Sequence, residues 1–292
     1  MFPPKKKDLT VGLLLADTQS GSRLSPIPPN LVLPKIEWRM NKGQAYMWDK
    51  WENMMDVIPK RLDFFIHLGE VLQGPVRQNH PSYELLTDDK VEQAAIFEAL
   101  VSPIVDRVAD HSSGEGKAWW LCRGSGWHEG LYGREADNVA KNLNAQPFPD
   151  GEPSGDILDL PIGPFNCNFS HHHPVFLQYK TSALEREQKW FAESVAQVER
   201  EDGTLVENYD LVARGHVHRY DAIDTGLGMA LTCPGWQLHM RYVISKNVAR
   251  SFPQHLGCVI VYFSPEEKAR GRRGIWLEPI LYEHPRRAMA TL

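Results

Sequence analysis

Short apolar runs that stop at an acidic residue or a histidine recur along this chain, and they constrain its fold more than any other feature. LTVGLLLAD ends in Asp17, RLDFFIHLGE ends in Glu70, and YDLVARGH ends in His216. Apolar runs of this length, bounded by polar residues and glycine, are typical of buried strands. Each run therefore predicts a strand that delivers a polar side chain to the edge of a sheet.

Helical patterns alternate with these runs. Aromatic and methionine residues recur at helical spacing over 42–60, residues 88–110 predict a long amphipathic helix bent near Pro103, and residues 182–200 predict a third helix. Further strands are expected at 117–124, 165–174, 227–233, 238–245, 257–263 and 275–282, and a surface loop or lid at 143–155. With no internal repeat and no linker, we expect one α/β domain over residues 1–292, with its core at about 9–283.

Composition narrows the classes of function. The net charge of −5 gives no overall attraction to nucleic acid or to an anionic membrane, and no apolar run reaches the roughly 20 residues of a membrane span. The basic clusters Lys5–Lys7, Lys268–Arg273 and Arg286–Arg287 are interpreted as solvated termini and a hairpin tip, with a phosphate-guiding rim as the alternative. Without a signal peptide or a CxxC pair, we expect a cytoplasmic protein with reduced thiols at Cys122, Cys167, Cys233 and Cys258.

The polar residues at the strand ends form a coherent set. In a layered α/β fold the carboxyl ends of parallel strands meet in one crevice, so side chains from distant segments can converge there. Carboxylates and imidazoles suit Mn²⁺, Fe²⁺ and Zn²⁺, and a pair of such ions can clamp both oxygens of a displacement at phosphorus. The candidates are Asp17, Glu70, His128, His171, His172, His173, His216 and His218.

The order of these motifs resembles that of the calcineurin-like metallophosphoesterases, whose pattern is D-x-H, G-D, G-N-H, H and G-H-x-H. This chain has ADTQSGSRL, HLGEVLQG, RGSGWHEG, SHHHP and GHVH in that order, and it looks closest to a phage-encoded subgroup with a loosened third motif. The resemblance runs from about residue 10 to about residue 262. It implies a four-layer αββα sandwich of two mixed sheets flanked by helices, and a phage or prophage origin.

The resemblance also implies roles for individual residues. Asp17 and His218 would bind a first divalent ion, and His216 would bind a second together with His171 or, in an alternative frame counted from Pro174, His172. Glu70 would bridge the ions, hydroxide on the metals would attack phosphorus, and His128 would assist the leaving group. Mn²⁺ is the expected ion, with Zn²⁺, Fe²⁺ and Mg²⁺ as alternatives.

The chain departs from the family pattern at three places. Gln19 replaces the histidine of D-x-H and could bind a metal only through its amide oxygen, Glu70 replaces an aspartate, and the asparagine ligand is lost. Ser125 or Trp127 stands nearest to that asparagine, depending on the frame. These departures weaken the expectation of catalysis more than that of metal binding.

The expected activity is hydrolysis of a phosphodiester, in a nucleic acid or a nucleotide, with no membrane partner. Arg23 and Arg123 lie beside motifs and could balance phosphate charge, although surface ion pairs explain them equally well. Two alternatives remain open. One is a phosphomonoesterase or protein phosphatase, and the other is a degraded phosphoesterase that serves as a binding module.

Overall fold

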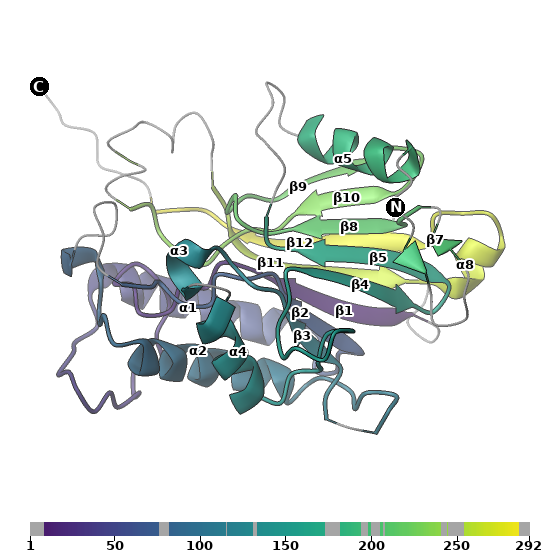
Figure 1. The fold of residues 1–292 in the computed structure, drawn as a ribbon. Coiled ribbons are helices and arrows are strands. Elements are labelled where there is room, and N and C mark those ends of the chain that lie inside the picture. The colour runs from purple at the N-terminus through teal and green to yellow at the C-terminus, as the bar shows by residue number, and fades with distance from the viewer. Residues whose placement is uncertain are drawn as a thin grey trace, which may run out of the picture.

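The computed structural model describes residues 9–75, 82–114, 116–130, 133–172, 182–193, 198–199, 205–206, 208–240, 244 and 254–285. Two mixed five-stranded sheets stack on each other, and helices cover their outer faces (Figure 1). Side chains from both sheets fill the space between them, as in the contact between the rings of Phe165 and Phe263, whose centroids are 5.1 Å apart. The predicted αββα sandwich of two mixed sheets is confirmed.

The first sheet joins the two ends of the described chain. Its order is β12 (Ile275–Tyr282), β11 (Leu256–Phe263), β1 (Thr10–Leu15), β2 (Phe64–His67) and β3 (Trp119–Leu121). Strands β1, β2 and β3 run parallel, whereas β11 is antiparallel to both of its neighbours. The carboxyl ends of β1 and β2 therefore lie at the same edge.

The second sheet repeats this arrangement. Its order is β4 (Ile157–Ile162), β5 (Phe165–Ser170), β8 (Leu211–Arg214), β10 (Met229–Thr232) and β9 (Asp221–Asp224). The central strands β5, β8 and β10 are parallel, and the two edge strands pair antiparallel with them. A separate small hairpin joins β6 (Val198–Glu199) and β7 (Leu205–Val206).

Helices α1 (Lys42–Val57), α2 (Lys90–Val105) and α4 (Arg134–Asn142) lie on the outer side of the first sheet, and α5 (Ser182–Glu193) packs against β10 of the second (Figure 1). Short helices are α3 (Gly126–Glu129), α8 (Pro265–Ala269) and the 3-10 turn η2 (Ser82–Glu84). A capping box between Asn41 and Gln44 starts α1, and the Asp89 carboxylate accepts from backbone N–H groups at the start of α2. Helix α2 contains Pro103, as the sequence predicted.

Several predicted elements differ from the structure. The prediction of a strand at 238–245 is wrong where the structure describes this segment. Residues 238–240 are irregular, and residue 244 is helical. Here the Gln237 amide bonds to Gln73 and Ser22, and the Leu238 N–H donates to the Leu24 carbonyl, so this segment packs on loops instead of joining a sheet. The helix predicted at 182–200 is described only to Glu193, and β6 occupies 198–199. The loop predicted at 143–155 is confirmed.

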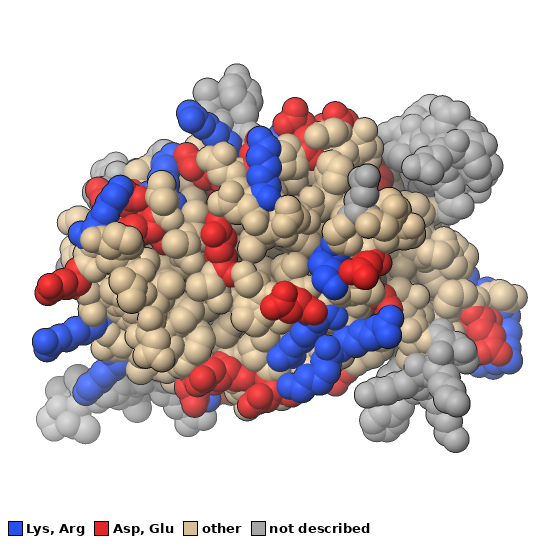
Figure 2. All heavy atoms as spheres, turned by 90° about the horizontal axis from the view of Figure 1, so that it is seen from below, with Lys and Arg blue, Asp and Glu red and all other residues tan. Residues whose placement is uncertain are grey.

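Charged side chains of both signs are distributed over the surface of the described chain. Figure 2 shows basic and acidic side chains interspersed on the face seen from below. In the described basic cluster, Lys268 pairs with Asp210 at 2.6 Å and Arg273 with Asp224 at 2.6 Å, which supports the hairpin interpretation over a phosphate-guiding rim. Lys5–Lys7 and Arg286–Arg287 lie outside the described residues.

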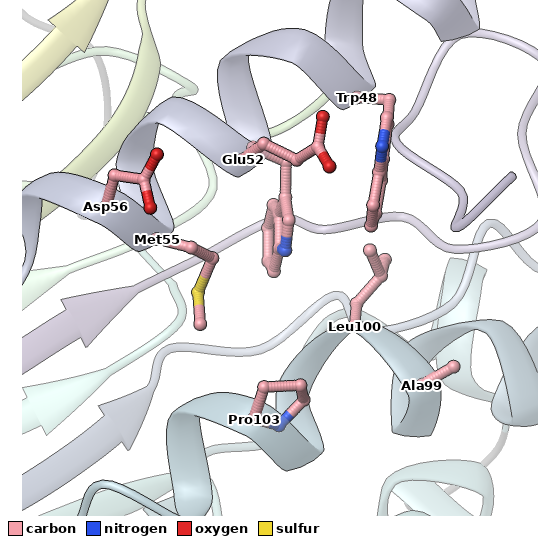
Figure 3. A pocket seen from close by; sticks show the side chains of 8 residues that line it. Trp48, Glu52, Met55, Asp56, Ala99, Leu100 and Pro103 are labelled. Atoms are coloured by element: carbon pink, nitrogen blue, oxygen red, sulfur yellow. The ribbon is translucent and has the colours of Figure 1, made fainter. Parts of the chain in front are cut away.

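Two further features complete the fold. All four cysteines are buried and free, as expected, and no helix of the described part is long and apolar enough to cross a bilayer. A surface pocket of ≈ 470 Å³ lies between α1 and α2, with Trp48, Glu52 and Asp56 on one side and Leu100 and Pro103 on the other (Figure 3). None of the metal-ligand candidates lines this pocket.

Candidate metal centre

The predicted ligands follow the carboxyl ends of four parallel strands. Asp17 and Glu70 come just beyond β1 and β2 of the first sheet, and His171 and His216 come just beyond β5 and β8 of the second. A backbone hydrogen bond from Asp17 N to Gly69 O, 3.0 Å, joins the two loops of the first sheet, and one from Gly215 N to His171 O, 3.1 Å, joins the two loops of the second. Both sheets therefore deliver polar side chains to one place.

The backbone at these loops is unusual. Six non-glycine residues of the described chain have positive φ, and five of them are predicted ligands: Asp17 at 53°, Gln19 at 42°, Glu70 at 55°, His216 at 73° and His218 at 50°. Left-handed backbone costs a non-glycine residue of order 1–3 kcal/mol and is concentrated at functional sites, where the surrounding structure enforces it. This clustering is evidence for a functional site that does not depend on any motif.

Asp17 connects the first sheet to the histidines of the fifth motif. Its Oδ2 accepts from the backbone N–H of His216 at 3.0 Å, and its Oδ1 lies 3.3 Å from His218 Nε2. The carboxylate is fully buried. A Cβ at Gly235 would lie 2.7 Å from His218 Nδ1 and 3.2 Å from the Cβ of Asp17, so glycine is required for this close approach.

Glu70, His171 and His216 form a tight triangle of ligand atoms. Glu70 Oε1 lies 3.2 Å from His171 Nε2 and 3.8 Å from His216 Nδ1, and the two imidazole nitrogens are 3.2 Å apart. Two ligands bound at about 2.1 Å to a tetrahedral ion are about 3.4 Å apart, so these three atoms are spaced as ligands of one ion. His171 Nδ1 lies 2.7 Å from the Leu68 carbonyl oxygen and donates to it, which leaves Nε2 available as a ligand.

Charge complementarity reinforces this geometry. Burial alone would raise the pKa of Glu70, but the imidazoles of His128, His171 and His216 outweigh it and hold this pKa well below its usual value. Burial would likewise lower the pKa of His171, yet the adjacent Glu70 carboxylate raises it to about 9. Burial also opposes protonation of His218, and the Asp17 carboxylate overcomes it and raises the pKa. Without a metal, the anionic carboxylates thus attract protons to the imidazoles.

The third motif places His128 and Ser125 beside Glu70. His128 Nδ1 donates to the Gln73 carbonyl at 2.8 Å, and its Nε2 faces the site 3.7 Å from Glu70 Oε1. The Ser125 hydroxyl, nearest to the lost asparagine in the loosened frame, donates to Glu70 Oε1 at 2.8 Å. Trp127, nearest in the compact frame, is 40% exposed and offers no metal-ligand atom.

Two groups of three side chains could each hold a divalent ion. Their ligand atoms lie within 4.8 Å of one another, and the groups are Asp17, Glu70 and His218, and His171, His172 and His216. His171 is buried whereas His172 is exposed, so both frames of the fourth motif reach the site; His173 lies outside the described residues. Buried Asp17 Oδ1 has no hydrogen-bond partner among the described residues, as expected for an atom that faces a cation. The residues present therefore fit divalent ions.

The structure adds a residue that the sequence did not identify. Glu129 is fully buried, and its two oxygens accept from the backbone N–H groups of Val71 at 2.7 Å and Gly124 at 2.6 Å. It therefore ties the loop that carries Glu70 to the loop that carries Ser125. An acid next to a histidine in GWHE carries no signal for this role, because the partners are backbone atoms of distant loops.

The two arginines considered for phosphate binding have other contacts. Arg23 Nε donates to the Leu85 carbonyl at 2.9 Å, and Arg123 pairs with Asp137 at 3.1 Å. These contacts in the described chain favour the alternative of ion pairs and loop contacts.

Comparisons with known proteins gave structural matches only. No family model matches the sequence, and no curated protein matches it. Among solved structures, Vps29 of Entamoeba histolytica complexed with Zn²⁺ matches with a TM-score of 0.40 and 11% identity over 93% of this chain and 98% of the other. An archaeal phosphodiesterase matches at 0.39 and 12% over 93% and 99%, and a predicted phosphoesterase from Streptococcus pneumoniae at 0.36 and 9% over 94% and 98%. These values assign no activity to the chain.

Proposed function

We propose that this protein is a divalent-metal-dependent phosphoric ester hydrolase that cleaves a phosphodiester in a nucleic acid or a nucleotide. The observation that carries the proposal is the convergence of Asp17, Glu70, His171, His216 and His218 on one site, with the carboxylates buried and His216 open to solvent, on turns that mostly require left-handed backbone. Buried acids and imidazoles at ligand spacing are the donor set of borderline divalent ions. The sequence motifs that resemble metallophosphoesterases give the same assignment.

Each group of ligands has a defined task in this proposal. Asp17 and His218 hold one ion, His216 with His171 or His172 holds the other, and Glu70 lies between the two groups. Gln19 is the remaining candidate ligand, through its amide oxygen. Bound divalent ions, Mn²⁺ first, would supply Lewis acidity at the phosphoryl oxygens and lower the pKa of water.

His128 manages the proton of the leaving group. The Gln73 carbonyl accepts from Nδ1–H and orients the ring, so Nε2 is the atom that gives the proton to the departing oxygen. The ring is buried in the wall of the site, which excludes competing water from this nitrogen. His128 contacts substrate in this proposal and does not hold a metal.

The proposal extends to the setting of the protein. We assign residues from about 9 to 283 to one metallophosphoesterase-like domain, supported by a hydrophobic core that is continuous from Leu13 to Ile275. A cytoplasmic location agrees with four free, buried cysteines. The phage-encoded subgroup and the phage or prophage origin rest on the GSRL and GWHEG segments alone.

A binding protein derived from a phosphoesterase is the second candidate. It is favoured by the hydrogen bond from Gln19 Nε2 to Glu70 Oε2, 2.7 Å, because this bond occupies an oxygen of a proposed metal ligand. A phosphomonoesterase is a further option within the enzyme class, since the same ions suit both kinds of ester.

Metal content and turnover test the proposal together. The purified chain would be analysed for bound metals by mass spectrometry and assayed with bis(p-nitrophenyl) phosphate and p-nitrophenyl phosphate in added Mn²⁺. Metal binding with turnover of the diester supports a phosphodiesterase. Turnover of the monoester alone supports the phosphomonoesterase, and metal without turnover of either ester supports the binding protein.

Variants separate the roles of the histidines. His216→Ala removes a ligand, so both bound metal and turnover should fall. His128→Ala should keep the metal while the rate falls by about 10²–10⁴-fold, the usual contribution of a general acid. His111→Ala is the matched control, because His111 is a histidine outside the site that contacts Ser113. Equal losses in the control would refute these assignments.

A further inference from the structure

The Gln19 side chain lies among the ligand atoms of one candidate group. Its Nε2 donates to Glu70 Oε2 at 2.7 Å and lies 3.3 Å from His218 Nε2. Glu70 and His218 are two of the three members of the Asp17 group. The amide therefore occupies a lone pair of Glu70 that an ion would use, and its nitrogen lies beside His218.

The orientation of the amide is fixed by its surroundings. If the amide were turned over, its oxygen would face the Glu70 carboxylate oxygen at 2.7 Å, and two acceptors would repel each other at that distance. With Nε2 toward Glu70, the amide oxygen Oε1 is buried without a hydrogen-bond partner among the described residues. The chain thus tolerates an unpaired oxygen in order to direct N–H groups at Glu70.

At the other group, the donor found in the described structure is a hydroxyl instead of an amide. His171 Nε2 and His216 Nδ1 face each other at 3.2 Å and lie 3.2 and 3.8 Å from Glu70 Oε1. The Ser125 hydroxyl donates to this oxygen at 2.8 Å, but it can turn its proton away from an incoming ion and has lone pairs of its own, whereas the amide nitrogen has none. The two groups are therefore unequal in what an incoming ion must displace.

We infer that Gln19 closes the Asp17–Glu70–His218 group to metal, and that the centre holds a single tight ion in the group of His171, His172 and His216 with Glu70. The Gln19 amide takes the place of the ion in this group by donating a hydrogen bond to the Glu70 carboxylate. This inference rests on the proposed function for the presence of a metal, and it replaces the two-ion arrangement of that proposal with a single ion. It also opposes the sequence-based expectation that Gln19 is a ligand.

The size of the effect follows from the bond to Glu70. A hydrogen bond to a buried charged group contributes about 1.5–3 kcal/mol, which corresponds to roughly 10- to 150-fold in an equilibrium constant. An ion entering the Asp17 group must break this bond, so it should bind about 10- to 100-fold more weakly than without the amide.

The metal count of the intact chain is the decisive experiment. The protein would be stripped with a chelator, titrated with Mn²⁺ and followed by calorimetry, metal analysis and electron paramagnetic resonance. We expect one tight Mn²⁺ per chain and the spectrum of isolated ions. Two tight ions with the spectrum of a coupled pair would overturn the inference, whatever the turnover.

Two substitutions test the role of the amide. Gln19→Glu is isosteric, cannot donate to Glu70 and adds a carboxylate, so a second tight Mn²⁺ and a larger stabilisation of the chain by Mn²⁺ are expected. Gln19→Met removes the donor without adding a ligand, so the second Mn²⁺ should bind about 10- to 100-fold more tightly than in the wild type, though less tightly than in Gln19→Glu. A count of one in Gln19→Glu, with its melting transition intact, would overturn the inference.

The outcomes separate this inference from the proposed function. One ion in the wild type with two in Gln19→Glu supports the inference even if no ester is hydrolysed. Two ions in the wild type refute it and leave the proposed metal centre standing. No ion in any variant refutes both. If a variant fails to fold, the wild-type count still decides.

Discussion

Substitution of Glu129 by glutamine should destabilise the chain by an amount that depends on pH. Both oxygens of this buried carboxyl accept backbone N–H groups, from Val71 at 2.7 Å and Gly124 at 2.6 Å. Glutamine keeps one acceptor but directs an NH₂ group at the other N–H. Leaving a buried donor unpaired costs about 1–3 kcal/mol, so we expect Glu129→Gln to lose about that much at pH 7.5.

The pH dependence follows from the pKa of Glu129. Burial, the largest influence, raises this pKa from 4.5 to about 7, against the lowering effect of the two backbone N–H groups. Between these values the folded chain binds more protons than the unfolded chain, so this group's contribution to stability falls as pH rises from about 4.5 to 7. Glutamine does not titrate. The stability gap between wild type and Glu129→Gln should therefore be about 2–3 kcal/mol wider at pH 5 than at pH 7.5.

Urea unfolding at both pH values measures this gap. Comparing wild type and variant at each pH cancels the titration of all other groups that the substitution leaves unchanged. Glu52→Gln is the matched control, because Glu52 is exposed on α1 and should change stability by less than about 0.5 kcal/mol. A gap that stays constant or narrows at pH 5 would show that burial does not control the protonation of Glu129.

Three further predictions concern the site and its support. The apparent affinity for Mn²⁺ should rise by up to about tenfold per pH unit between pH 6.5 and 8.5. The reason is that binding must release the proton that the Glu70 carboxylate holds on His171, whose pKa is about 9. Isothermal titration at several pH values measures this affinity, and an affinity that does not change with pH would contradict the prediction. Gly124→Ala should lower thermal stability and metal affinity together, since a Cβ would lie 2.4 Å from the Glu70 backbone N. Glu187→Gln should destabilise the chain by about 3 kcal/mol in urea unfolding, because it leaves the buried Arg214 guanidinium without its carboxylate partner. In the wild type the guanidinium lies 2.6 Å from Glu187 Oε1. A loss of stability below about 0.5 kcal/mol would contradict the prediction.

The sequence predicted the central strands and their ligands because each strand has a strong local signal. Strand β1 is apolar over its final residues and β8 is apolar up to Ala213, and polar residues follow in both cases, so the pattern alone indicates where Asp17 and His216 lie. Convergence of these ends then follows from the geometry of parallel strands.

The two edge strands of the second sheet, β4 and β9, escaped prediction for a physical reason. Strand β4 contains Pro161 and is partly exposed, and β9 has an acid at each end and alternates half-buried with exposed residues, so neither has the continuous apolar run of a central strand. A proline is tolerated at the edge of a sheet because one side of the strand has no partner. In the second sheet, local patterns therefore identify the central strands better than the edge strands.

The contacts inside the site were beyond local patterns altogether. Gln19 and Glu70 lie 51 positions apart, and Gln19 and His218 lie 199 apart, so their hydrogen bonds depend on how three loops pack. The sequence marked Gln19 as a departure from the family motif, but it could not show that the amide points its N–H groups at the other ligands. The same holds for Glu129, whose partners are backbone atoms.

The metal-free site neutralises its carboxylates in two ways that a cation would replace. A proton on His171 is favoured by Glu70, and the Gln19 amide donates to the same carboxylate. Five residues with left-handed backbone, on three loops, hold these groups together, so the arrangement costs free energy that local packing must offset. Because an ion binds only the folded arrangement, it should stabilise the chain against unfolding in proportion to the logarithm of its concentration. Since the proton is easier to displace than a fixed amide, the histidine group should fill first.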